Sequence, residues 1–94
     1  MHGLSVETYN KIKEVFNKYP ECNFKLFGSR AKGTYKYNSD IDIALVNDVS
    51  EDVADQIKID LAKINIIYKI DFVVVKSCNN DKLIENIINE GVDF

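Results

Sequence analysis

Two aspartates separated by one residue, Asp40 and Asp42, are the side chains of this 94-residue sequence whose spacing first suggests chemistry. The apolar run that follows them predicts a β-strand, and alternate residues of a strand point to the same face. The two carboxylates then share one face, whereas Ile41, Ile43 and Leu45 point to the opposite face. Like charges side by side on a half-buried strand are costly unless a positive group lies between them. We therefore expect a divalent metal ion at this pair.

A third carboxylate, Asp71, interrupts the most apolar predicted strand, residues 70–75. Buried acids need partners, and Asp71 can join Asp40 and Asp42 if the two strands are neighbours. Three carboxylates on one face of a sheet could hold two Mg²⁺ ions, which prefer oxygen ligands at about 2.1 Å and keep waters for substrate phosphates. Two such ions, about 4 Å apart, can hold both the attacking and the leaving oxygens of an in-line displacement.

A small-residue turn, Gly28-Ser29, precedes the carboxylates and follows a short predicted strand over residues 24–27. Glycine lets the backbone approach a ligand closely, and the serine hydroxyl lies where the amides of a helix start favour anions. Ser29 could equally be an ordinary N-cap, a role compatible with phosphate binding. Arg30 either contacts a triphosphate or lies on the solvated surface of the short helix. With the metal site, this turn predicts phosphoryl or nucleotidyl transfer from a nucleoside triphosphate.

Two other motifs compete with this interpretation. Residues 28–33 match the glycine spacing of a P-loop, but Thr34 occupies the position where a P-loop requires lysine. Glycosyltransferases also use an Asp-x-Asp pair to hold a metal-bound sugar nucleotide, but the chain is too short for their usual nucleotide-binding domain. Without Asp71 and the glycine turn, Asp40 and Asp42 would be no more than a solvated strand start.

The elements that must position these residues can be read from periodicity and capping. A helix is predicted to begin after Ser5 and to be ended by Pro20, with an apolar face at three- and four-residue steps. Its expected apolar positions are Val6, Tyr9, Ile12, Val15, Phe16 and Tyr19. Strand 24–27, a helical turn near 30–33, a loop over 35–39 and strand 41–46 follow. A second long helix begins after Ser50, residues 70–75 form a third strand, and a last helix follows Asn79-Asn80-Asp81.

The last helix is expected to end at Gly91 and to face the core with four apolar residues. These four residues are Leu83, Ile84, Ile87 and Ile88. The predicted fold is a small α/β domain of the α+β kind, with a mixed sheet of three or so strands flanked by helices, in one domain over residues 1–94.

Composition restricts the classes of partner. No apolar run approaches the ~20 residues that span a membrane, and no signal-peptide pattern opens the sequence. Cys22 and Cys78 have no paired spacing, which predicts reduced cysteines in a cytoplasmic protein. The net charge is −3 and the pI is about 5.0, with the basic residues concentrated before Asp40 and the acidic residues after it. This distribution favours a metal-bound polyphosphate, and direct nucleic-acid binding is not expected.

The motif Phe27-Gly28-Ser29, ten residues, and then Asp40-Ile41-Asp42-Ile43 resembles the nucleotidyltransferase superfamily of DNA polymerase beta. The short length resembles its minimal members, the MNT proteins. The resemblance implies a polymerase-beta-like fold in which Asp40, Asp42 and Asp71 bind metal and are catalytic. It also implies that Asp71 helps to activate the attacking hydroxyl and that Gly28 and Ser29 hold the triphosphate of ATP. Lys36-Tyr37-Asn38 replaces a common proline-containing turn, which we interpret as loop variation.

The same resemblance implies a partner. MNT proteins occur with helical HEPN proteins encoded nearby, which can be ribonuclease toxins, and act as antitoxins by moving AMP from ATP onto a tyrosine of the partner. Two alternatives remain open at this point. The chain could be a non-catalytic module that neutralises a helical partner by binding it, or the catalytic subunit of a two-protein nucleotidyltransferase with a small-molecule acceptor.

Overall fold

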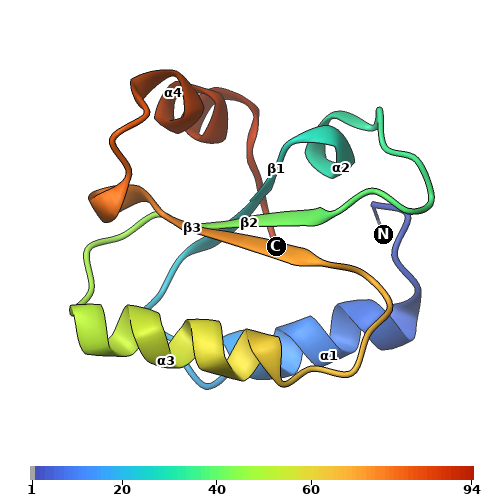
Figure 1. The fold of residues 1–94 in the computed structure, drawn as a ribbon, viewed down its shortest axis with the longest axis horizontal. Coiled ribbons are helices and arrows are strands. Elements are labelled where there is room, and N and C mark those ends of the chain that lie inside the picture. The colour runs from blue at the N-terminus through green and yellow to red at the C-terminus, as the bar shows by residue number, and fades with distance from the viewer. Residues whose placement is uncertain (1) are drawn as a thin grey trace.

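A four-stranded mixed sheet lies between two layers of helices in the computed structural model, which describes residues 2–94 (Figure 1). The elements in chain order are α1 (Val6–Phe16), β1 (Phe24–Phe27), α2 (Ser29–Lys32), β2 (Ile41–Leu45), α3 (Glu51–Ala62), β3 (Ile70–Val74), the 3₁₀-helix η1 (Val75–Ser77), α4 (Asp81–Glu90) and β4 (Val92–Asp93). The spatial order of the strands is β3-β2-β1-β4, with β2 and β3 parallel and the other pairs antiparallel. The predicted α+β class is confirmed.

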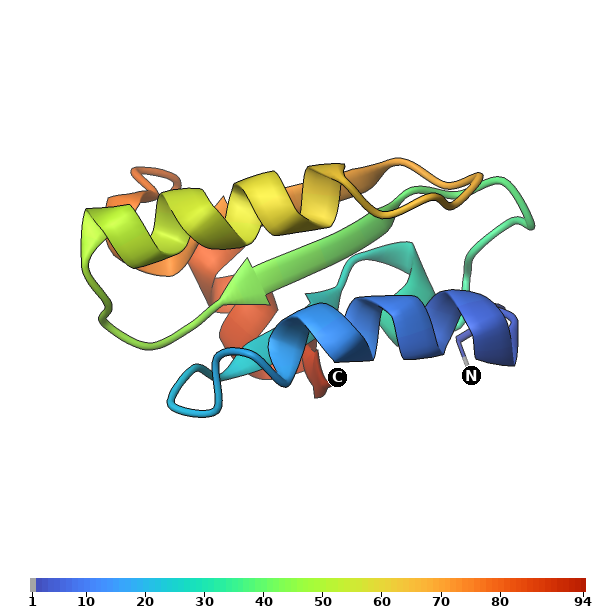
Figure 2. The same cartoon turned by 90° about the horizontal axis from the view of Figure 1, so that it is seen from below.

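Helices cover both faces of the sheet. α1 and α3 lie side by side under one face, as the view from below shows (Figure 2), and α2 and α4 lie over the other face. The main core lies between the sheet and the α1/α3 layer, where Ile41, Ile43 and Leu45 of β2 are fully buried. A smaller core on the α2/α4 face joins Phe27 and Ala44 to Ile87 of α4. The alternation predicted for β2 is therefore confirmed.

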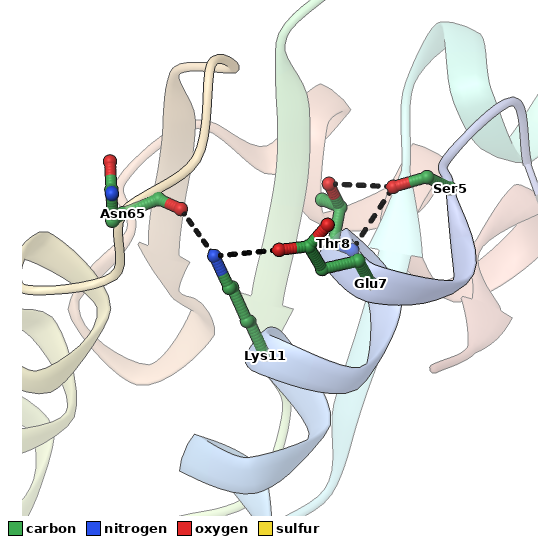
Figure 3. A network of polar contacts seen from close by, with 5 residues as sticks. All are labelled: Ser5, Glu7, Thr8, Lys11 and Asn65. Carbon is green, nitrogen blue, oxygen red and sulfur yellow. Dashed lines mark hydrogen bonds and ion pairs between the residues drawn. The ribbon is translucent and has the colours of Figure 1, made fainter.

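Polar side chains cap the long helices where the sequence predicts them. Ser5 and Ser50 accept hydrogen bonds from the backbone amides three residues later, and Asn80 caps α4 in the same way. Figure 3 shows the first of these caps together with Lys11 of α1. The Lys11 ammonium donates to the carbonyl of Asn65 and pairs with the Glu7 carboxylate, so that α1 is tied to the loop that leads into β3.

Two apolar positions predicted to face the core are exposed. Val6 is 76% exposed and Ile88 is 61% exposed. Each α-helical residue turns by about 100°, so Val6 lies about 120° around α1 from the buried Ile12, and Ile88 lies about 100° around α4 from the buried Ile87. A helix that packs on one face of a sheet buries a narrower stripe of its surface than the apolar faces predicted for α1 and α4.

The remaining differences concern element ends. α1 ends at Phe16, before Pro20, and the residues up to Tyr19 continue as tighter turns. β4 was not predicted, because its two residues, Val92 and Asp93, are too few to show a strand period; Val92 lies opposite Leu26 of β1. No helix within residues 2–94 is long and apolar enough to cross a membrane.

Candidate active site

The parallel pairing of β2 with β3 brings two of the predicted carboxylates together. Asp42 and Asp71 are direct partners in the register, although about thirty residues separate them in the sequence. The backbone amide of Ile41 donates to the carbonyl of Lys69, which fixes this register where both strands begin. Asp40 lies immediately before β2 and is exposed. The neighbouring strands on which the predicted triad depends are therefore confirmed.

The three carboxylates are electrostatically coupled at Asp42. Burial, the charges of Asp71 and Asp40 and a hydrogen bond with Asp71 together raise the pKa of Asp42 to about 6, with burial as the largest cause. The Arg30 guanidinium acts in the opposite direction. A carboxylate whose ionised form is disfavoured by its own neighbours is a common feature of functional sites, because a cation or a proton must supply the missing compensation.

Lys69 forms an ion pair with another of the predicted acids, Asp71. Its ammonium lies 3.5 Å from a carboxylate oxygen of Asp71, but the side chain is 72% exposed and can move into solvent. Sequence reasoning missed Lys69. Its position two residues before Asp71 is a usable signal, since residues i and i+2 of a strand share a face.

Gly28 lies directly against the carboxylate of Asp42. A Cβ atom at this position would overlap Oδ2 of Asp42, and the Gly28 backbone has φ +73° and ψ −152°, a conformation that is essentially restricted to glycine. Two separate constraints therefore require glycine where the turn meets the carboxylates. The glycine turn therefore lies directly beside the strand that carries Asp42.

Ser29 opens α2, a helix of four residues that ends in the left-handed Gly33. The Ser29 carbonyl accepts the amide of Thr34, and the Gly28 carbonyl accepts the amide of Lys32. The amides at the start of any helix have no partner within that helix, and in α2 they follow directly on Gly28. Ser29 thus follows directly on the glycine that lies against Asp42, and its contact with a triphosphate stays a prediction.

Arg30 was expected either to contact a triphosphate or to lie on the solvated helix surface, but the structure places it in a buried polar environment. Its side chain is only 1% exposed, and its guanidinium donates four hydrogen bonds to the carbonyls of His2, Tyr37 and Ser39. It also lies over the rings of Tyr35 and Tyr68. The alternative of a solvated surface residue is therefore wrong for Arg30. Its contact with a triphosphate stays a prediction, and the donors that it would use already have acceptors.

The donor chemistry of the site fits a hard divalent cation. The three side chains are carboxylates, and their mutual repulsion at Asp42 is the effect that a bound cation relieves. Within residues 2–94, however, no three acidic, histidine or cysteine side chains are close enough to enclose an ion by themselves. This is compatible with Mg²⁺, which is typically held by one or two carboxylates and completed by waters and substrate phosphates.

A cavity in the described part of the chain lies elsewhere. It has a volume of about 620 Å³ and runs along the free edge of β3 against α3, where Phe72, Val74 and Lys58 are among the residues that line it. None of the three predicted catalytic carboxylates lines this cavity. The candidate active site is instead formed on the α2/α4 face of the sheet, at the end where the loops into β2 and β3 meet (Figure 1).

Comparisons with known proteins find a family model and solved structures that are similar to the chain. A family model described as "Polymerase beta, Nucleotidyltransferase" matches residues 10–93 of the chain. The search of curated proteins found no match to the chain. Among solved structures, a toxin-antitoxin with AMP-PNP is similar, with a TM-score of 0.66 and 27% identity over 89% of this chain and 69% of the other.

Two variants of the toxin-antitoxin pair MntA-HpeT are similar to the same extent. The variant with two aspartate-to-glutamate substitutions has a TM-score of 0.64 and 25% identity, over 89% of this chain and 69% of the other. A variant with a tyrosine-to-alanine substitution has a TM-score of 0.65 and 26% identity, over 92% of this chain and 70% of the other.

Proposed function

Because the chain belongs to the polymerase beta nucleotidyltransferase family, we propose that it is a Mg²⁺-dependent enzyme that transfers AMP from ATP to a protein hydroxyl. The acceptor in this proposal is a tyrosine of a helical, HEPN-type partner encoded nearby, and the transfer makes the chain the antitoxin of a two-protein pair. Residues 1–94 act as one nucleotidyltransferase domain.

The observation that carries the proposal is the contact between the glycine turn and the acids. Gly28 lies against the Asp42 carboxylate, and Asp42 is the register partner of Asp71. A phosphate held by Gly28 and Ser29 would therefore lie beside the carboxylates. The matched structures include a toxin-antitoxin with AMP-PNP, an ATP analogue, which supports the choice of ATP and of a protein partner.

The proposed reaction is an in-line displacement at the α-phosphorus of ATP. The tyrosine oxygen forms a bond to the α-phosphorus, the bond from that phosphorus to the bridging oxygen breaks, and pyrophosphate leaves with the electron pair. When bound, Mg²⁺ would neutralise the phosphate charge and hold the attacking and leaving oxygens. Asp40 and Asp42 would hold the metal with Asp71. A tyrosine hydroxyl has a pKa of about 10, so its proton needs an acceptor, and Asp71 takes this role.

The test is transfer of labelled AMP. The chain is incubated with α-³²P-labelled ATP, Mg²⁺ and the purified helical partner, and the label on the partner is followed with time and mapped by peptide sequencing. We expect a labelled tyrosine, and a loss of at least about 100-fold in rate for Asp42→Asn, because a metal-holding charge is removed. Asp93→Asn, an exposed aspartate of β4, is the matched control and should keep the wild-type rate.

Three outcomes would contradict the proposal. The wild type could leave the partner unlabelled, or Asp42→Asn could transfer AMP as fast as the wild type. Alternatively, the label could move into a small molecule, which would favour a two-protein enzyme with a small acceptor. The binding-only alternative is tested separately in cells. If Asp40→Asn/Asp42→Asn suppresses partner toxicity as well as the wild type at equal expression, complex formation alone is sufficient.

A further inference from the structure

Arg30 is a buried cation without a carboxylate partner. Its side chain is 1% exposed. Within residues 2–94, no carboxylate lies close enough to the guanidinium, 4.0 Å or less, to form an ion pair with it. Arg30 acts on the Asp42 carboxylate only at longer range. Burying a charge without a direct ion pair is expensive, so the surroundings must supply many favourable contacts. These contacts come from backbone carbonyls and aromatic faces, and they come from three separate segments of the chain.

The first segment is the loop that leads into β2. Nε and Nη2 of Arg30 both donate to the carbonyl of Ser39, at 3.2 and 2.8 Å, and Nη2 also lies 3.4 Å from the carbonyl of Tyr37. Ser39 is the residue immediately before Asp40. The two hydrogen bonds from the guanidinium to the Ser39 carbonyl therefore fix the backbone that carries the Asp40 side chain.

The second segment is the turn before α1. Nη1 of Arg30 donates to the carbonyl of His2 at 2.8 Å. Next to it, Gly3 has φ +75° and packs so closely on Tyr35 that a Cβ atom would overlap the ring. The guanidinium of Arg30 lies over the same Tyr35 ring, 5.2 Å from its centroid.

The third segment is the loop before β3. The guanidinium carbon lies 4.8 Å from the ring centroid of Tyr68, three residues before Asp71. A cation over an aromatic face is attracted by the ring quadrupole, more strongly where water is excluded. Arg30 itself follows Gly28 and Ser29 in the turn at the start of α2. One side chain thus links the glycine turn to both segments that carry the acids.

We propose that Arg30 is a positioning residue for nucleotidyl transfer. It holds the 34–40 loop so that the Asp40 carboxylate keeps its position relative to Asp42 and the Gly28-Ser29 turn. This inference rests on the proposed function. Arg30 does not touch the nucleotide in this role, and acts through the backbone that it holds. Lysine cannot replace it, because an ammonium lacks the planar fork that donates twice to one carbonyl and stacks on aromatic rings.

The experiment compares Arg30→Lys with Lys36→Ala, which removes an exposed cation from the same loop. Hydrogen exchange of the free protein is measured first, without nucleotide or partner. We expect Arg30→Lys to increase the exchange rates of amides in residues 36–40 at least about 10-fold, while Lys36→Ala leaves them close to wild type. Unchanged exchange in Arg30→Lys would overturn the inference.

Kinetics then separate positioning from nucleotide contact. In the transfer assay, Arg30→Lys should lower kcat at least about 10-fold and change KM for ATP by less than about 3-fold, because it misplaces an acid rather than removing a phosphate contact. A rise in KM for ATP with unchanged kcat would assign Arg30 to the triphosphate and overturn the inference.

If the wild type transfers no AMP, the proposed function fails, and binding of Mn²⁺ measured by electron paramagnetic resonance replaces the kinetic arm. Weaker Mn²⁺ binding to Arg30→Lys than to Lys36→Ala supports the positioning role without turnover, and equal binding overturns it. Should Arg30→Lys fail to fold, Tyr68→Leu removes one aromatic face and leaves all four hydrogen bonds of Arg30 in place. It should change exchange in residues 36–40 in the same direction, by a smaller factor, and no change would overturn the inference.

Discussion

At the scale of single residues, Asp42 is kept in a position that opposes its ionisation. Burial, together with Asp71 and Asp40, raises its pKa to about 6. Between its ordinary value near 4 and pH 6, the folded protein holds a proton that the unfolded chain has lost, so the contribution of Asp42 to stability falls as the pH rises through this window. Above pH 6 the Asp42 carboxyl is ionised in the folded protein as well, and the full destabilisation by its unfavourable surroundings is present. The site thus costs stability at neutral pH when no cation is bound.

We expect Asp42→Asn to stabilise the metal-free protein at pH 7.5, on the order of 1 kcal/mol after allowance for solvent screening, because an amide cannot ionise. At pH 4 the two proteins should be nearly equal, since the wild-type carboxyl is protonated there. Urea unfolding in the presence of EDTA at both pH values checks this. Asp93→Asn serves as the control, and an Asp42→Asn variant no more stable than the wild type at pH 7.5 would contradict the repulsion.

Gly28 and Gly33 allow a comparison at the two ends of α2. Both have positive φ angles, +73° and +79°, but an added Cβ would overlap Asp42 only at Gly28, and would meet nothing within 4 Å at Gly33. We expect Gly33→Ala to lose about 1 kcal/mol of stability and to keep AMP transfer. Gly28→Ala should lose more stability and at least about 100-fold in transfer rate, because the carboxylate is displaced.

Rates for both glycine variants are to be measured well below their melting temperatures, so that unfolding does not contribute. Equal transfer rates in the two variants would show that the contact between Gly28 and Asp42 has no bearing on the reaction.

At the scale of the elements, α1 and α3 are held together beneath the sheet by a polar contact that the sequence did not reveal. The Tyr19 hydroxyl, just beyond α1, donates to the Asp60 carboxylate of α3. Burial and this hydrogen bond raise the pKa of Tyr19 to about 12, and the same bond lowers the pKa of Asp60. The raised tyrosine pKa contributes stability that is present below pH 10 and is lost as the pH rises to 12.

Tyr19→Phe should therefore destabilise the protein by about 1 kcal/mol at pH 7, the usual net value of one hydrogen bond. The difference from the wild type should shrink as the pH rises from 10 to 12, and also as acid protonates Asp60. Urea unfolding at pH 7 and pH 11.5 measures both values. Tyr37→Phe, at an exposed tyrosine, should leave the stability unchanged at both pH values. If Tyr19→Phe differs from the wild type by the same free energy at pH 7 and pH 11.5, the hydrogen bond to Asp60 is not the cause of the difference.

At the scale of the whole molecule, the sheet topology explains why a small chain can assemble this site. The parallel neighbours β2 and β3 both begin at the end of the sheet where the N-terminal turn and the loops meet (Figure 1). The α1/α3 layer covers the opposite face, so the main core and the carboxylates use different faces of the same strands. Stability is supplied on one face, and the polar site is formed on the other.

The sequence by itself determined the local elements and the residue types of the site. Helix caps at Ser5, Ser50 and Asn80, the extent of β1 and the inward face of β2 follow from short-range rules, because capping and alternation involve residues only a few positions apart. The Gly28-Ser29 turn and the Asp-x-Asp pair are local patterns of the same kind, and the family comparison agrees with the resemblance that they carry.

Only the tertiary structure decided which distant groups meet. The register that joins Asp42 to Asp71, the contact of buried Arg30 with the Tyr68 ring, and the pairing of β4 with β1 all depend on contacts between segments far apart in the chain. No period or cap encodes such contacts, since they depend on which faces pack. The same reason explains Val6 and Ile88, whose apolar character is local information, whereas their exposure depends on how α1 and α4 lie against the sheet.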